Sequence, residues 1–219
     1  MITTRLRRRA AAVVLSLTAV LATSAATLPA PAPALAQAPA SGPAPAPAKA
    51  PFAAKAAAPT CPQFADPVHA AADRRVDVDR ITPEPVWRKT CGTLYRSDGR
   101  GPSVVFEQGL HPKDVINGQY DIEQYVLVNQ PSPYVSTTYD HDLYKTWWKS
   151  GYNYYIDAPG GVDVNKTIGD THKWADQVEV AFPGGIERKY IIGVCPVDKK
   201  TKTEIMSDCE SNPHYEPWH

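Results

Sequence analysis

The stretch that decides the fold is Lys173-Trp174-Ala175-Asp176-Gln177-Val178-Glu179-Val180-Ala181-Phe182-Pro183-Gly184-Gly185. Residues 177–182 alternate polar and apolar and stop at Pro-Gly-Gly, a pattern that predicts a half-buried strand followed by a turn. Side chains two residues apart on a strand share one face. We therefore expect Gln177 and Glu179 to lie side by side, and Val178 and Val180 to point together toward a core.

Two segments precede this stretch in a fixed order: Leu94-Tyr95-Arg96-Ser97-Asp98, and then Tyr134-Val135-Ser136-Thr137-Thr138. The chain lacks a G-x-G-x-x-G turn, a P-loop and a G-x-S-x-G elbow, which argues against a Rossmann dehydrogenase, an NTPase and an α/β-hydrolase. Asp140-His141-Asp142 is a poor metal motif, because adjacent residues cannot all converge on one ion. We interpret it as the solvated start of a helix.

The first 36 residues have the features of a secretory signal peptide. A basic region is followed by an apolar, small-residue stretch, and Ala34-Leu35-Ala36 fits a cleavage site, with Thr23-Ser24-Ala25 as the alternative. Nothing later resembles a membrane span. We predict a secreted protein with no membrane partner.

Residues 37–60 are rich in Ala and Pro, which predicts a disordered linker because the segment has few large side chains to bury. The remaining residues, 61–219, are the predicted catalytic domain. Its charge differs from the formal net charge of zero of the whole chain. Six basic residues and no acidic one precede position 61, so 17 Lys and Arg face 23 Asp and Glu, a net charge of −6. This charge argues against tight nonspecific binding to duplex DNA.

All four cysteines lie in the predicted domain, and an even number in an exported chain indicates two disulfides. Three pairings are possible, and proximity in sequence favours Cys61–Cys91 and Cys195–Cys209. The second would close a loop of about 15 residues, worth roughly 3 kcal/mol in the chain-entropy model. A zinc site is disfavoured because no two cysteines have C-x-x-C spacing.

The coarse pattern of the domain is α+β with a mainly antiparallel sheet. Residues 122–128 fit either a helix or a strand. We expect helices within 62–80, 103–109 and 140–149, and strands at 93–96, 135–138, 152–157, 177–182 and 189–194.

The ordered set of aromatic-Arg, Ser-Thr-Thr and Gln-x-Glu resembles the mono-ADP-ribosyltransferases of the cholera-toxin type. Their fingerprint is Arg, then Ser-Thr-Ser/Thr, then Gln/Glu-x-Glu. Lesser motifs resemble a secreted, pierisin/Scabin-like Streptomyces branch that modifies guanine, over residues 88–209. Two departures are Thr138 in place of Ser and Trp148 where relatives carry Tyr. The lesser motifs are Tyr95-Arg96-Ser97-Asp98-Gly99-Arg100-Gly101-Pro102, Leu127-Val128-Asn129, Trp147-Trp148-Lys149 and Lys173-Trp174-Ala175-Asp176.

The resemblance implies an ADP-ribosyltransferase fold of two packed, mainly antiparallel β-sheets flanked by helices. It also implies roles for individual residues. Glu179 would bind the ribose 2-hydroxyl of NAD and stabilise an oxocarbenium-like centre, with Gln177 beside it as the second catalytic residue. Residues implied to bind NAD are Arg96, Arg100, Asn129, Ser136, Thr137, Thr138 and Trp147, and those implied to bind the acceptor are Trp174, Gln177 and Lys149.

The sequence therefore predicts a secreted, monomeric mono-ADP-ribosyltransferase that uses NAD as co-substrate and no metal. Its predicted acceptor is guanine in nucleosides, nucleotides or DNA, with NAD hydrolysis as a side reaction. One alternative is a secreted toxin that modifies a protein side chain. Another is a binding module that retains only the fold, which Arg96, Gln177 and Glu179 disfavour. The natural acceptor and the target organism stay open.

Overall fold

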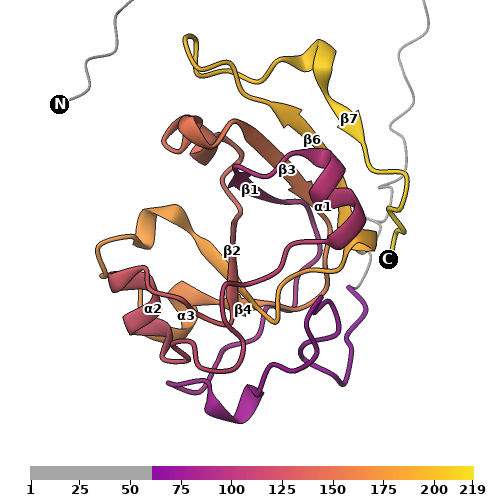
Figure 1. Cartoon of the computed structure of the whole chain (residues 1–219). Helices are drawn as coiled ribbons and strands as arrows, with labels where there is room; N and C mark the ends of the chain where they lie inside the picture. Colours follow the sequence, from indigo (N-terminus) through magenta and orange to yellow (C-terminus); the bar gives the residue numbers. More distant parts are fainter. Residues whose placement is uncertain (1–60) are drawn as a thin grey trace, which may run out of the picture. The chain divides into compact units, whose positions relative to one another are not determined.

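The computed structural model describes residues 61–219, and the predicted signal peptide (1–36) and linker (37–60) lie outside them. Seven strands occur in the order β4-β5-β2-β1-β3-β6-β7, and neighbouring strands are antiparallel (Figure 1). The strands are β1 (Leu94–Asp98), β2 (Tyr134–Thr138), β3 (Tyr152–Ile156), β4 (Val162–Asp163), β5 (Glu179–Pro183), β6 (Ile191–Pro196) and β7 (Glu210–Ser211). The helices are α1 (Pro102–Gln108), α2 (Ile122–Val128) and α3 (Val164–Ile168). Short 3-10 turns are η1 (Val78–Arg80), η2 (His141–Lys145), η3 (Trp148–Ser150), η4 (Ala175–Gln177), η5 (Arg188–Tyr190) and η6 (Met206–Asp208).

The sheet is nearly divided between β1 and β2. These strands are joined by a single residue pair, Tyr95 opposite Thr138, whereas β1 and β3 pair along their full length. The expected two sheets correspond to the halves on either side of this junction, β4-β5-β2 and β1-β3-β6-β7. The α+β, antiparallel architecture is the one that the sequence predicts.

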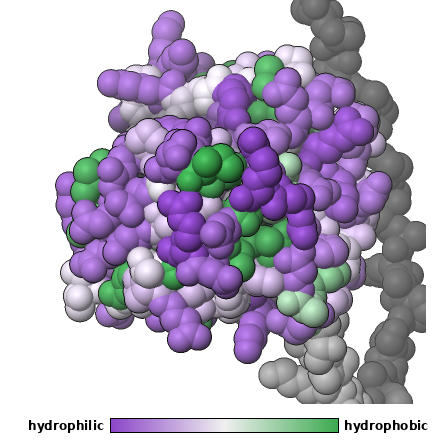
Figure 2. All heavy atoms as spheres, turned by 60° about the horizontal axis from the view of Figure 1, so that its bottom comes forward, coloured by the Kyte–Doolittle hydropathy of each residue, from purple (hydrophilic) through white to green (hydrophobic). Residues whose placement is uncertain are grey.

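Two hydrophobic cores pack against the sheet, and the first contains residues from both halves, whereas the strand residues of the second come only from β4-β5-β2. Helix α1 contributes to the first core, and α2 and α3, which lie side by side in Figure 1, contribute to the second. Strand β5 is buried on both faces, because Val180 and Phe182 enter the first core and Ala181 enters the second. Figure 2 shows that the face turned forward there is mainly hydrophilic, with apolar residues in small separate patches.

The structure corrects the prediction for residues 177–182. The strand begins only at Glu179, Gln177 ends η4, and Val178 between them adopts a left-handed backbone with φ 41°. Gln177 and Glu179 are therefore not neighbours on one strand face, and Val178 is 38% exposed instead of entering a core. The cause is a tether, because the Thr138 hydroxyl donates a hydrogen bond of 2.6 Å to the Gln177 carbonyl and holds the loop against β2.

Other local predictions met mixed outcomes. Residues 62–80 contain the short turn η1 and no α-helix, because their backbone groups bond to distant loops, as Asp73 N–H does to the Gly184 carbonyl at 2.8 Å. Residues 140–149 form η2 and the start of η3 in place of one helix, and 189–194 become strand only from Ile191. The open segment 122–128 is helix α2, whose first turn is capped by the Asp121 carboxylate.

The expected disulfides, Cys61–Cys91 and Cys195–Cys209, are both present, with Cα atoms 5.5 and 4.2 Å apart. The first ties the start of the domain to the segment before β1. The second closes the loop between β6 and β7. Within residues 61–219, no helix is both long and apolar enough to cross a bilayer.

Candidate active site

Three adjoining cavities surround Ser136 of β2, which lines all of them. The ring cavity, about 210 Å³, is lined by Tyr95, Arg96, Tyr144, Trp147, Asn153 and Gln177 among others. The cation cavity, about 510 Å³, is lined by Arg96, Asp98, Arg100, His111, Lys113, Tyr125 and Asn129 among others. The carboxylate cavity, about 230 Å³, is lined by Tyr125, Asn129, Trp147, Trp174, Gln177 and Glu179 among others. Shared lining residues make the three cavities one cleft.

Glu179 is the carboxylate that lines the carboxylate cavity. It is the first residue of β5 and shares a strand face with Ala181, which directs it toward α2. Only 9% of the residue is exposed, and the Tyr125 hydroxyl of α2 donates a hydrogen bond of 2.7 Å to its Oε1. Burial raises the pKa of Glu179 above its usual 4.5, while hydrogen bonds from Tyr125 and Ser136 and the charge of Arg96 oppose that rise.

Arg96 and Arg100 are both held by Asp98 at the end of β1. Arg96 Nε donates to Asp98 Oδ2 at 2.9 Å, and Arg100 binds both oxygens, at 2.9 Å to Oδ1 and 2.8 Å to Oδ2. The two guanidinium groups hold the pKa of Asp98 far below its usual 3.8, despite the opposing effect of its burial. Arg96 also donates to the Ser136 carbonyl at 2.7 Å, so the cation is fixed against β2.

The two threonines of β2 support the neighbouring strand. Thr137 Oγ1 donates to the Val180 carbonyl at 2.8 Å, and Thr138 Oγ1 donates to Gln177 as described. Both residues are almost fully buried, although their strand lines the ring cavity. Ser136, by contrast, has a hydroxyl directed to Glu179. All three residues of the Ser-Thr-Thr sequence line the ring cavity, but the two threonine hydroxyls bond to the backbone of β5 and η4 and so position those elements.

The predicted acceptor residues are only partly brought together. Trp174 and Gln177 line the carboxylate cavity at the two ends of the turn that precedes Glu179, with Trp147 and Asn129 on its other walls. Lys149 lies outside all three cavities, and its ammonium lies 5.5 Å from the centre of the Trp148 ring. Contact between Lys149 and an acceptor stays a prediction.

Tyr125 and Asp98 are site residues to which the sequence assigned no role. Tyr125 stands four residues before Asn129, a spacing that places two residues on one face of a helix. This spacing could not be used, because the sequence pattern of residues 122–128 fits either a helix or a strand. Asp98 was visible in the motif, but two arginines converging on one carboxylate follow from the turn after β1 and not from spacing alone.

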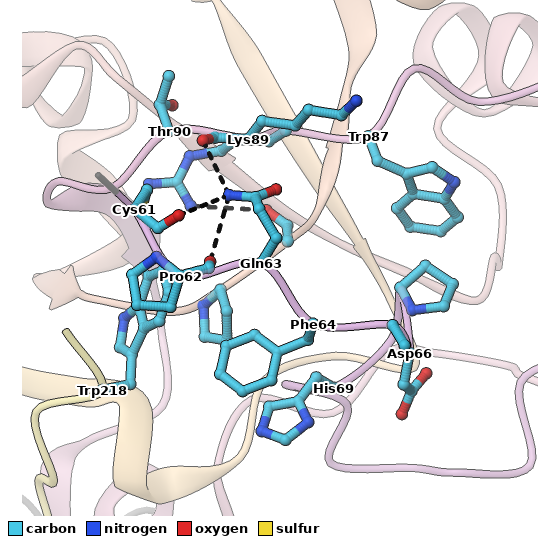
Figure 3. A pocket seen from close by; sticks show the side chains of 15 residues that line it. Cys61, Pro62, Gln63, Phe64, Asp66, His69, Trp87, Lys89, Thr90 and Trp218 are labelled. Carbon is cyan, nitrogen blue, oxygen red and sulfur yellow. Dashed lines mark hydrogen bonds between the residues drawn. The ribbon is translucent and has the colours of Figure 1, made fainter.

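A separate cavity of about 320 Å³ lies beside the Cys61–Cys91 disulfide (Figure 3). Aromatic side chains line it, including Phe64 and His69, whose stacked rings have centroids 3.9 Å apart. Its one carboxylate, Asp66, is engaged by Arg74 at 2.6 Å. It contains none of the predicted catalytic or substrate-binding residues, so we place the active site in the cleft around Ser136.

Among residues 61–219, no three His, Cys, Asp or Glu side chains are grouped so that they could hold a metal ion. Asp142 of the Asp-His-Asp sequence pairs with Lys145 at 2.6 Å in the exposed turn η2. His141 Nε2 faces Tyr155 and Glu204, while its Nδ1 lies 3.1 Å from Asp142 Oδ1. The Asp140 carboxylate caps the first turn of η2, which agrees with the interpretation of the sequence as a helix start.

Comparison with known proteins identifies close relatives. A family model described as Scabin-like matches residues 94–215. A guanine-specific ADP-ribosyl transferase of Streptomyces coelicolor is 86% identical over 163 residues, which cover 74% of this chain and 80% of the relative. Pierisin of Pieris brassicae is 39% identical over 110 residues, 45% of this chain and 13% of pierisin.

Solved structures agree with the sequence comparison. Scabin toxin from Streptomyces scabies in complex with NADH has a TM-score of 0.74 at 85% identity, covering 75% of this chain and 100% of the chain in that structure. A guanine-specific ADP-ribosyltransferase has a TM-score of 0.72 at 86% identity, covering 73% of this chain and 99% of that structure.

Proposed function

The chain belongs to the Scabin-like family, and from this premise we propose that it is an NAD-dependent mono-ADP-ribosyltransferase that modifies guanine. The relatives confirm the predicted family resemblance, the enzyme class and NAD as the co-substrate. One observation carries the functional conclusion for this chain: Glu179 is buried, receives the Tyr125 hydroxyl, and lies in one cavity with Gln177 and Trp174. The residue roles below are our proposal.

The charges of the cleft suggest how NAD lies in it. Four basic side chains and one acidic side chain line the cation cavity, which suits the pyrophosphate of NAD: Arg96, Arg100, His111 and Lys113 against Asp98. The ring cavity carries Tyr95, Tyr144 and Trp147, which suit the planar nicotinamide. The ribose between these two groups then lies near Ser136, where both cavities meet the carboxylate cavity.

The reaction needs little acid catalysis. The bond between the anomeric carbon and the nicotinamide nitrogen breaks, and nicotinamide leaves as a neutral molecule with the bonding electrons. An oxocarbenium-like ribose remains, and the Glu179 carboxylate stabilises it through its charge and through the 2-hydroxyl. The exocyclic amine of guanine then bonds to the anomeric carbon and releases a proton. Water in place of guanine gives the NAD hydrolysis side reaction.

The acceptor is expected to bind beside Gln177 and Trp174. The Gln177 carboxamide both donates and accepts hydrogen bonds, which suits the edge of guanine that carries the exocyclic amine. The indole of Trp174 offers a surface on which a base can stack. Both side chains line the cavity that contains Glu179, so a base held there faces the anomeric carbon.

The decisive experiment gives the enzyme NAD with a mixture of GMP, DNA and cell lysate, followed by mass spectrometry of all products. We expect ADP-ribose on guanine, and labelling of guanosine but not of inosine, which lacks the exocyclic amine. Comparable labelling of inosine would contradict the amine assignment. Protein labelling with untouched guanine would instead support the alternative of a protein-modifying toxin.

The choice between mononucleotides and DNA rests on charge. The net charge of −6 in residues 61–219 favours small guanine compounds, whose labelling should lose little rate with added salt. We also infer that the protein is secreted, which the signal-like sequence and the two disulfides support, and that it acts as a monomer without a membrane partner. Mass spectrometry of culture medium and the molar mass of the purified protein in solution test these inferences.

A further inference from the structure

The segment between β2 and β3 forms one wall of the ring cavity. Its residues Tyr144 and Trp147 line that cavity, and its turn η2 begins at His141. His141 Nε2 lies 2.9 Å from the Tyr155 hydroxyl and 3.2 Å from Oε2 of Glu204. The wall is therefore attached to a carboxylate that lies outside the cleft.

Glu204 comes from the loop between β6 and β7, which the Cys195–Cys209 disulfide closes. Figure 1 shows this loop at the same end of the molecule as the segment between β2 and β3. Only 6% of the Glu204 side chain is exposed. The loop backbone is fixed independently of that side chain, because Ile205 N–H bonds to the Pro196 carbonyl at 2.8 Å.

The Glu204 carboxylate joins three side chains around the ring cavity. Besides His141, it accepts hydrogen bonds from the Asn153 amide at 2.8 Å and from the Tyr155 hydroxyl at 2.9 Å. Asn153 is only 1% exposed and lines the ring cavity. The Tyr95 ring, which also lines the cavity, packs edge-on against His141 and Tyr155, with centroids 4.9 and 5.3 Å away.

We propose that Glu204 is a positioning residue that holds the walls of the ring cavity in the shape that receives the nicotinamide end of NAD. The inference rests on the proposed function of the cleft. Glu204 does not line any of the three cavities and so acts through Asn153, Tyr155 and His141. A carboxylate suits this task because both of its oxygens accept hydrogen bonds, and the Asn153 amide and the Tyr155 hydroxyl both donate to it.

Glu204→Gln separates positioning from folding. The new amide keeps one acceptor oxygen but presents its own N–H donors to the remaining donors, which disturbs the walls while the disulfide and the loop backbone bonds remain. Glu210→Gln is the matched control, because Glu210 is an exposed carboxylate on β7, in the same hairpin. His141→Gln is a second variant at a partly exposed position, in case the first does not fold.

The measurements are KM and kcat for NAD hydrolysis, Kd for NADH by calorimetry, and the melting temperature. We expect Glu204→Gln and His141→Gln each to raise KM and Kd about fivefold, the loss of one hydrogen bond, with kcat within about twofold of wild type. The double variant should have KM and Kd no higher than those of Glu204→Gln alone, because the contact that His141→Gln removes is one of those that Glu204→Gln already disturbs. Unchanged KM and Kd, or a fall in kcat alone, would overturn the proposal.

The same experiment distinguishes this proposal from the function on which it rests. A wild-type enzyme that neither hydrolyses NAD nor binds NADH would contradict the proposed function. A wild-type enzyme with both properties, beside variants that only melt at a lower temperature, would contradict the positioning role alone.

Discussion

Two buried carboxylates on opposite sides of Ser136 have opposite electrostatic surroundings. The guanidinium groups of Arg96 and Arg100 donate to the two oxygens of Asp98 at 2.8 to 2.9 Å, and the Arg100 backbone N–H donates to Oδ1 at 3.0 Å. Glu179 receives a hydroxyl, and among residues 61–219 no cation lies within ion-pair distance of it. The pKa of Asp98 is accordingly far below 3.8, whereas burial raises the pKa of Glu179 above 4.5.

The difference indicates a division of labour. Asp98 is fully paired and holds Arg96 and Arg100 in positions where they can bind the pyrophosphate of NAD. Glu179 accepts hydrogen bonds and feels the charge of Arg96, but it forms no ion pair with any of residues 61–219, so its charge is available to stabilise a positive charge that develops on ribose. A carboxylate at position 179 that was already paired with a cation would stabilise the positive charge of the transition state much less.

The two groups also affect stability with opposite sign. The depressed pKa of Asp98 stabilises the fold at pH above 3.8, and this contribution is lost as pH falls through the folded value. Glu179 behaves in reverse, because the folded protein keeps a proton that the unfolded chain has already released. Its contribution therefore becomes less favourable as pH rises from 4.5 toward the raised folded value.

The largest expected effect comes from removing the charge of Glu179. Glu179→Gln should lower both guanine transfer and NAD hydrolysis by at least about a thousandfold, since the oxocarbenium centre loses its counter-charge. The melting temperature at pH 7 should be equal to or above that of wild type, because the variant no longer buries an ionised carboxylate. Kinetics and calorimetry check both parts, and turnover close to wild type would remove Glu179 from the mechanism.

Removing the paired carboxylate should have a smaller effect on rate and the opposite effect on stability. Asp98→Asn frees both guanidinium groups, so KM for NAD should rise about thirtyfold with a smaller change in kcat. Stability should fall by about 2 kcal/mol, less than for a fully buried pair because both arginines are partly exposed. Denaturant unfolding at several pH values measures this, and a stability loss that does not shrink as pH falls below 3.8 would contradict the assignment.

The sequence predicted the members of this cleft better than their arrangement. Arg96, Ser136 and Glu179 were found because each lies on a strand and the three motifs occur in a fixed order. Polar-apolar alternation misplaced Gln177, because β5 is buried on both faces and the positive φ at Val178 is set by the tether from Thr138. Tyr125 was missed because a seven-residue helix fixed by its cap carries too little periodicity to separate it from a strand.

Substitutions of Gln177 and Trp174, the two residues proposed to bind the acceptor, should affect transfer to guanosine more than NAD hydrolysis. Gln177→Ala and Trp174→Ala should each lower transfer to guanosine about tenfold and leave NAD hydrolysis within about threefold, because water needs neither stacking nor an amide partner. Asp176→Asn is the control, since Asp176 is an exposed residue of the same turn η4. Equal losses in the two reactions would assign Gln177 and Trp174 to NAD binding or to the fold.

The smallest expected effect tests what keeps Glu179 ionised. Tyr125→Phe removes the 2.7 Å hydroxyl donor that lowers the Glu179 pKa, so that pKa should rise further. Because the ionised carboxylate is the active form, the acid limb of the pH profile for NAD hydrolysis should move to higher pH, with about a fivefold loss near its midpoint. Tyr134→Phe is the matched control, because the neighbouring Tyr134 hydroxyl bonds to the Tyr120 carbonyl at 2.6 Å and not to Glu179. It should lower stability without moving the acid limb. An acid limb that stays in place in Tyr125→Phe would show that burial, Ser136 and Arg96 set the charge of Glu179 without Tyr125, and would weaken the contrast with Asp98.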